Sequence, residues 1–340
     1  MDVSLLLPLA DRIPAMTAPC RVHERLWPIG EESLAWARSH GLVLGEADST
    51  RIGRGRFERL VCRILPDVAP ARAVLLTEWL LWLFALDDTI DDGPIRRSAT
   101  SVDALYEPLA LTLRRGTARP GASTLETALA DLWARTAPGM SQDWRRRFRD
   151  HLAWHRQGCL DEAVARRTGE LPAPSRYPAV RRRLHGPFLL DLLEPALRTE
   201  VPDEVLGLRA WQILVDGTAD VTAWSNDLVA YTPDAHSPLN HVAVTARQLD
   251  LPPRTAAAVL VHERIWARLE EVGHAARALG PELRRLRLDP LRARGVARVA
   301  SALLAAPRAH LDWLHECGRY SPMPDPSVPS PRRKPRVTLT

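Results

Sequence analysis

Four aspartates directly follow a fully apolar stretch of the chain. The run WLLWLFAL covers residues 79–86, and the next six residues contain Asp87, Asp88, Asp91 and Asp92. Asp87 and Asp91 are four apart, so a helix brings both carboxylates to one face. Like charges at this spacing repel, and negative charge at a helix C-terminus opposes the helix dipole. The pattern favours a bound cation such as Mg²⁺, which prefers oxygen ligands, and a solvated acidic helix end is the alternative.

A second polar patch lies in the segment WSNDLVAYTPD. Asn226, Ala230 and Asp234 recur at intervals of four, which predicts one stripe along one helix. Side-chain oxygens at two of these three positions would suit another Mg²⁺. A helix end followed by a turn at Pro233 explains the same residues equally well.

The elements that must position these residues are predicted to be helices. Arg, Leu and Ala dominate the 340 residues, whereas the β-branched residue Ile occurs only eight times. Helical patterns alternate with short Pro- and Gly-rich breaks, and Gly217 is expected to be another break. We therefore predict a single all-α domain over residues 21–321. Residues 1–20 and the Pro-, Ser- and Arg-rich stretch 322–340 are predicted to be disordered.

Composition argues against several other classes of protein. The net charge is only +5, and the arginines are interspersed with acids along most of the chain, which disfavours nucleic-acid binding. The longest apolar run has eight residues, far short of the ~20 that span a bilayer. The four cysteines form no C-x-x-C pair, so structural zinc is not indicated. A reducing cytoplasm is the expected location.

Four motifs together resemble those of bacterial class I terpene synthases. FALDDTIDD is similar to the aspartate-rich DDxxD motif, and NDLVAYTPD is similar to the second metal motif of the family. RYPAVRRRLHG resembles the segment that holds the diphosphate-sensing arginine, and WLHECGRY resembles the C-terminal Trp followed by an Arg-Tyr pair. The motifs occur in the family's order, and the resemblance extends over about residues 21–321.

The resemblance implies a set of metal ligands. Asp87 would be the principal Mg²⁺ ligand, with Asp91 and Asp88 completing its shell through water. Asn226 and Asp234 would hold the remaining metal, with three Mg²⁺ ions expected once substrate diphosphate is bound.

The resemblance also implies residues that bind the diphosphate. Arg181 would sense it, and Arg319 with Tyr320 would hydrogen-bond it once the site closes. Guanidinium groups suit this role because they bind phosphate oxygens in a bidentate fashion. Arg181 lies one residue short of the family's usual distance from Asn226, so Arg182 is the alternative sensor.

Three further features depart from the family pattern. Ala230 replaces the usual Ser or Thr of the second metal motif, and Asp234 replaces the commoner Glu. Leu184 and His185 stand where the family often has a small residue and a Gly, and Gly186 would then serve the helix break in a shifted register.

Aromatic residues near the motifs are candidates for stabilising carbocations by cation–π attraction. We expect this of Phe84, Trp224 and Trp313, whereas Trp79 and Trp82 are expected to fill the core. No chemical role is expected of His155, His185 or His241. Since the sequence indicates no general base, the departing diphosphate is the expected acceptor of the last proton.

The implied fold is a helical bundle around a deep apolar cavity. The implied activity is Mg²⁺-dependent ionisation and cyclisation of a linear isoprenyl diphosphate, with release of diphosphate, as in a carbon–oxygen lyase. Farnesyl diphosphate is favoured as substrate and geranylgeranyl diphosphate comes second. Two alternatives remain: a chain-elongating prenyltransferase, which would carry a second DDxxD motif, and a catalytically silent isoprenoid-binding protein. No membrane or nucleic-acid partner is expected, and a homodimer is an open expectation.

Overall fold

The computed structural model describes residues 20–45, 50–91, 94–173, 175–231, 237–251 and 256–319. These residues form α-helices joined by short turns and contain no β-strand. Three 3₁₀ turns, Gly53–Gly55, Pro94–Arg97 and Ala137–Gly139, occur between them. The expectation of an all-α fold is therefore confirmed. The stretches 1–19 and 320–340 lie outside the described residues, so the expected disorder of both ends remains a prediction.

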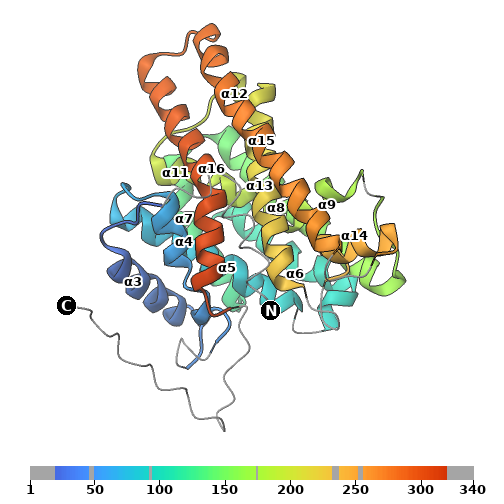
Figure 1. Ribbon diagram of the computed structural model, residues 1–340. Helices are drawn as coiled ribbons and strands as arrows, with labels where there is room; N and C mark the ends of the chain where they lie inside the picture. Colours follow the sequence, from blue (N-terminus) through green and yellow to red (C-terminus); the bar gives the residue numbers. More distant parts are fainter. Residues whose placement is uncertain are drawn as a thin grey trace, which may run out of the picture.

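The helices keep the labels of Figure 1. Their bounds are α3 Leu26–Ser39, α4 Phe57–Ile64, α5 Pro70–Asp91, α6 Ala99–Arg115, α7 Thr124–Thr136, α8 Gln142–Thr168, α9 Tyr177–Leu184, α10 Phe188–Asp191, α11 Leu193–Leu197, α12 Asp203–Leu206, α13 Arg209–Ala230, α14 His241–Leu249, α15 Ala256–Arg285 and α16 Pro290–Glu316.

Helix α5 lies inside the bundle and is buried on almost every side. Helices α3, α4, α7 and α11 all pack against it. Within the apolar run 79–86 only Phe84 is partly exposed, and Trp79 and Trp82 are almost completely buried, as expected. Because its surface is apolar all round, α5 gains most from burial in the middle of the fold.

Local signals in the sequence account for many helix ends. Ser123 and Glu126 form a reciprocal capping box at the start of α7. The hydroxyl of Ser141 accepts a hydrogen bond from the Trp144 N–H at the start of α8. Gly116 and Gly169 follow the ends of α6 and α8 with φ angles of 76° and 74°. The Pro- and Gly-rich breaks near 117–123 and 169–178 therefore separate helices, as predicted.

The expected break at Gly217 is wrong, because α13 continues through this residue without interruption. A Cβ atom at this position would lie 2.2 Å from Val272 Cγ2 of α15. Helices α13 and α15 lie side by side in Figure 1, in yellow and orange, and pack against each other. The glycine therefore permits a close helix contact within α13.

Gly158 sets the position of α9 in a similar way. A Cβ atom on this residue of α8 would lie 2.8 Å from the backbone nitrogen of Leu184 and 2.9 Å from the carbonyl carbon of Arg183. Backbone atoms cannot move aside as a flexible side chain can. The absence of a side chain at Gly158 therefore lets the end of α9, with its three arginines, pack directly on α8.

We expect Gly158→Ala to lower the free energy of unfolding by about 1–3 kcal/mol, because the added methyl group must push α9 away from α8. The control is Gly273→Ala inside α15, where the nearest atom to a new Cβ is Arg277 Nη1 at 3.6 Å. That change should raise the free energy of unfolding by roughly 0.5–1 kcal/mol through helix propensity. Denaturant titrations of both variants measure the difference, and equal effects would contradict this account of Gly158.

Candidate active site

The aspartates of the first motif occupy the last turn and a half of α5. Asp88 is paired with Arg319, whose Nη1 and Nη2 lie 3.2 Å and 2.7 Å from the two carboxylate oxygens. Arg51 Nη1 is a further 3.6 Å contact of the same carboxylate. The structure thus brings the first motif and the C-terminal motif together through Asp88. Asp92 lies outside the described residues.

Asp87 and Asp91 have less compensating charge. Burial, together with the nearby carboxylates of Asp91 and Asp88, raises the pKa of Asp87 to about 8, and the charge of Arg319 offsets this only in part. Burial and Glu162 also raise the pKa of Asp91, although Arg166 Nη2 lies 3.4 Å from its carboxylate. Burial is the larger cause of both raised pKa values, and the neighbouring carboxylates add to it, so ionisation of these two aspartates is disfavoured without a bound cation.

Helix α8 adds a charged pair that the sequence analysis did not identify. Arg166 Nη2 donates to Glu162 at 3.0 Å and also contacts Asp91. Glu162 in turn accepts a hydrogen bond from the Ser237 hydroxyl, in the segment that follows α13.

We call the charged cluster at this end of α5 the mouth, and its members are Asp87, Asp88, Asp91, Glu162, Arg166, Arg181 and Arg319. Glu162 and Arg166 have the i,i+4 spacing that is common on helix surfaces, so their location beside Asp91 could not be predicted from the sequence.

Arg181 joins the mouth to α13 through Asp227. Its Nε and Nη2 donate to the Asp227 carboxylate at 2.8–3.0 Å, and both side chains are buried. The same carboxylate accepts hydrogen bonds from the Tyr177 hydroxyl and the backbone N–H of His241, each at 3.0 Å. Asp227 therefore fixes the position of Arg181 next to Asn226, the first residue of the second motif.

Arg182 has different partners, further from the end of α13. Its Nη1 donates to Asp220 at 2.7 Å, and Arg268 of α15 donates to the same carboxylate at 2.9 Å. Asp220 lies almost two helical turns before Asn226. Of the two candidate sensors, the structure therefore places Arg181 beside the second motif.

The second motif is only partly contained in a helix, which corrects the expected stripe. Helix α13 ends at Ala230, and Tyr231 is extended with ψ 121°. Asn226 and Ala230 share this helix, which ends before position 234. Asp234 and Tyr320 both lie outside the described residues, so their placement remains a prediction.

Two of the three aromatic candidates lie beside the mouth. Phe84 stacks on Phe57, with 4.3 Å between the ring centroids. The guanidinium group of Arg319 lies over the Phe84 ring, 4.5 Å from its centroid. Trp313 packs against both rings, and its indole N–H donates to the Gly55 carbonyl. Trp224 is buried against His241, with ring centroids 4.8 Å apart. Phe84 is therefore already engaged by one cation in this structure.

An apolar cavity lies inward of the mouth and is bounded by α4, α5, α13, α16 and the connection from α9 to α11. Leu76 and Leu80 of α5 line it, two to three helical turns before Asp87. Thr218 and Thr222 of α13 also line it, and Asn226 follows at the next interval of four. Its volume is about 100 Å³. Ligand pockets usually measure about 300–1,000 Å³, so a long isoprenyl chain must displace some of the leucine side chains.

The connection after α9 forms one wall of this cavity. His185 caps the C-terminus of α9, and Gly186 follows with φ +78°, a conformation that favours glycine. A Cβ at Gly186 would also lie 3.3 Å from Leu83 of α5. The expectation that Gly186 serves the helix break is therefore confirmed. His185 has its side chain in the cavity wall, where its Nε2 lies 2.9 Å from Thr222 Oγ1.

His155, for which no role was expected, lies behind Asp87. Its Nε2 is 3.9 Å from Asp87 Oδ1, and its Nδ1 is hydrogen-bonded to the Tyr106 hydroxyl at 2.7 Å. Burial lowers the pKa of His155 to about 4, so the ring is neutral at pH 7 and adds no positive charge to the mouth. This contact could not be predicted from the sequence, because His155 and Asp87 lie in distant parts of the chain.

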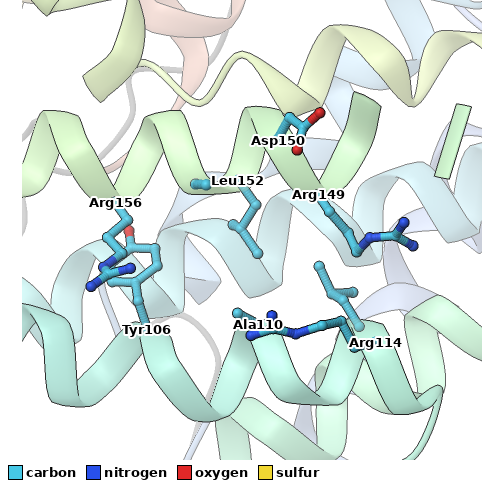
Figure 2. A pocket seen from close by; sticks show the side chains of 9 residues that line it. Tyr106, Ala110, Arg114, Arg149, Asp150, Leu152 and Arg156 are labelled. Carbon is cyan, nitrogen blue, oxygen red and sulfur yellow. The ribbon is translucent and has the colours of Figure 1, made fainter. Parts of the chain in front are cut away.

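A separate hollow of about 300 Å³ lies between α6 and α8. Figure 2 shows Arg114 of α6 together with Arg149 and Arg156 of α8 around it. None of the motif residues lines this hollow, so the apolar cavity behind the mouth is the candidate active site.

The donor groups at the mouth suit Mg²⁺ bound together with a phosphorylated substrate. The described residues contain no group of three or more His, Cys, Asp and Glu side chains that would hold a metal by itself. Mg²⁺ commonly takes one or two protein carboxylates and completes its shell with water and substrate phosphate. The undercompensated carboxylates of Asp87 and Asp91, on one face of α5, fit that mode of binding. Among the described helices, none has the length and apolar character needed to span a membrane.

Comparisons with known proteins agree with the fold and identify a metal-binding family. Residues 78–271 match the model of terpene synthase family 2, C-terminal metal binding. The chain is 30% identical to (-)-delta-cadinene synthase of Streptomyces clavuligerus over 308 residues, covering 86% of this chain and 89% of that protein. It is 29% identical to a (-)-beta-caryophyllene synthase of Saccharothrix espanaensis, covering 85% and 83%.

The same architecture occurs in solved structures. Germacradien-4-ol synthase from Streptomyces citricolor superimposes with a TM-score of 0.77 at 22% identity, covering 89% of this chain and 97% of that one. This similarity supports the fold, and the sequence matches, which extend from α5 across α13, support the family. The chain therefore belongs to terpene synthase family 2 and is a class I terpene synthase.

Proposed function

We propose that this protein ionises farnesyl diphosphate in the presence of Mg²⁺ and cyclises the resulting carbocation. The observation that carries the proposal is the mouth itself, where undercompensated carboxylates and buried arginines meet at the entrance of an apolar cavity. Similarity to synthases that cyclise farnesyl diphosphate, such as the one from Saccharothrix espanaensis, supports the fifteen-carbon substrate. Geranylgeranyl diphosphate is the second candidate.

In this proposal the mouth binds the diphosphate and the cavity receives the isoprenyl chain. Asp87 and Asp91 of α5, with Asn226 and Asp234 of the second motif, hold three Mg²⁺ ions, and Asp88 contributes through water. When bound, Mg²⁺ neutralises the charge that develops on the leaving diphosphate. Arg181 and Arg319 donate hydrogen bonds to the diphosphate oxygens, and Tyr320 joins them when the site closes.

Ionisation then breaks the carbon–oxygen bond of the substrate. The electron pair stays on the diphosphate, and an allylic carbocation remains in the cavity. Leucine side chains such as Leu80 and Leu189 exclude water from it, so ring closure competes successfully with hydration. Three aromatic rings would stabilise this carbocation by cation–π attraction: those of Phe84 and Trp313 beside the mouth, and that of Trp224. A cytoplasmic location and a homodimer remain predictions.

The substrate assignment is tested by incubating the purified protein with Mg²⁺ and the C10, C15 and C20 isoprenyl diphosphates. Mass spectrometry of the volatile products should show a cyclic C15 terpene as the main product, and chelation of Mg²⁺ should abolish it. Cyclic C20 products alone would transfer the assignment to geranylgeranyl diphosphate. Linear elongated diphosphates would instead support a prenyltransferase, and unchanged substrates would support a silent binding protein.

Asp87→Asn should lower kcat by about 100-fold or more, because it removes the charge that holds the metal opposite the leaving group. The fold should persist, since the change relieves repulsion among carboxylates at the C-terminus of α5. Circular dichroism verifies the fold, and steady-state kinetics measures the loss. Asp67→Asn is the control, because Asp67 forms an exposed ion pair with Arg21 on the surface. Wild-type turnover by folded Asp87→Asn would contradict the assigned role.

Arg181→Lys should reduce turnover by one to two orders of magnitude, since an ammonium group cannot reproduce the planar fork by which the Nε and Nη2 of Arg181 bind Asp227. Arg183→Lys should change turnover little, because Arg183 pairs with Asp161 on the partly exposed side of α9. Arg182→Lys provides the third arm. Kinetics of the three variants decides between the arginines, and a larger effect at Arg182 would assign the sensor to that residue.

A further inference from the structure

His310 of α16 is a buried polar side chain without a hydrogen-bond partner. Its Nδ1 has no partner among the described residues, and the residue is only 5% exposed. Buried side-chain nitrogens in folded proteins nearly always have such a partner. The ring also lines the apolar cavity. An unpaired imidazole is therefore kept at the surface where a carbocation would form.

The neighbours of His310 are aromatic rings and mostly apolar side chains, and Arg182 is the one charged residue among the described residues that line the same cavity. The ring of His185 lies 6.2 Å away and almost perpendicular to it, and Trp313 lies at 5.4 Å. His185 Nε2 is already held by the Thr222 hydroxyl. The described residues that line the cavity include no Asp or Glu. His310 and His185 are therefore the two imidazoles among the described residues that line this cavity, and Nδ1 of His310 has no hydrogen-bond partner there.

The charge state of His310 suits contact with a carbocation. Burial and the charge of Arg181 lower the pKa of His310 to about 3, and the pKa of His185 is also well below its usual value. Both rings are uncharged at pH 7. An uncharged imidazole offers a lone pair without repelling a positive intermediate.

His310 lines the cavity, and Arg181 is near enough for its charge to lower the pKa of the ring. His310 precedes Arg319 by nine residues, six of which continue α16 toward the mouth. Arg181 and Arg319, the residues offered to the diphosphate, are both at the mouth. A carbocation that has moved into the cavity therefore meets the ring of His310 in the cavity wall.

We propose that His310 accepts the proton that ends the cyclisation. The C–H bond next to the cationic carbon breaks, its electron pair forms the new C=C bond, and the proton binds the unprotonated ring nitrogen. The imidazolium then returns this proton to solvent when the product leaves. A carbocation is acidic enough to protonate even a weakly basic imidazole. The assignment rests on the proposed function and replaces the departing diphosphate as the final base.

The test compares diphosphate release with product identity in His310→Leu. Leucine keeps the position apolar and removes the unpaired buried nitrogen, so the melting temperature should be unchanged or higher. Diphosphate release should stay within about threefold of wild type, because ionisation takes place at the mouth. The share of the wild-type main product should fall by at least about tenfold, with other terpenes replacing it, since a general base commonly contributes 10²-fold or more.

Two further variants make the result specific. His315→Leu is the matched control, since this exposed residue of the same helix should leave the product mixture unchanged. His310→Asn restores a lone pair near the position of Nδ1 and should recover part of the wild-type product. Near-normal diphosphate release with an unchanged product mixture in His310→Leu would overturn the proposal. A changed product mixture in His185→Leu but not in His310→Leu would overturn it as well. Absence of diphosphate release in wild type would instead overturn the proposed function.

Discussion

Negative charge collected at the end of a buried helix is the constraint on which the rest of the site depends. Helix α5 is apolar on nearly all sides, so packing fixes its position and with it the position of the partly exposed aspartates at its end. The neighbouring helices neutralise this charge to different extents at the three aspartates. Arg319 from α16 pairs closely with Asp88, Arg166 from α8 is more distant from Asp91, and Asp87 faces a neutral histidine. The remaining imbalance is what a divalent cation and its substrate phosphate would complete.

Much of this arrangement follows from the sequence because it depends on local pattern. The apolar run 79–86 and the spacing of Asp87 and Asp91 are enough to predict a buried helix that carries two carboxylates on one face. The Pro- and Gly-rich breaks likewise separate helices as expected. In each case the information lies within about two helical turns, where intrinsic propensity and periodicity act directly.

Contacts between distant segments could not be predicted in this way. Arg181 and Arg182 are identical in type, and adjacent helix positions point about 100° apart, so only the location of Asp227 and Asp220 distinguishes them. The sequence predicts a helix break at Gly217 because it does not show that the side chain of Val272 packs against this residue. His185 and His310 each appear isolated in the sequence, and only the folded chain brings the two rings into one cavity wall.

The pairing of Asp88 with Arg319 joins residues that are 231 positions apart. Contacts between such distant positions require closure of a very long loop, which makes them late and slow to form during folding. The helical core around α5 can assemble from shorter-range contacts well before that, while its acidic end still faces solvent. The two halves of the mouth therefore meet only after α16 has been synthesised, so the catalytic entrance cannot form on the ribosome before this helix emerges.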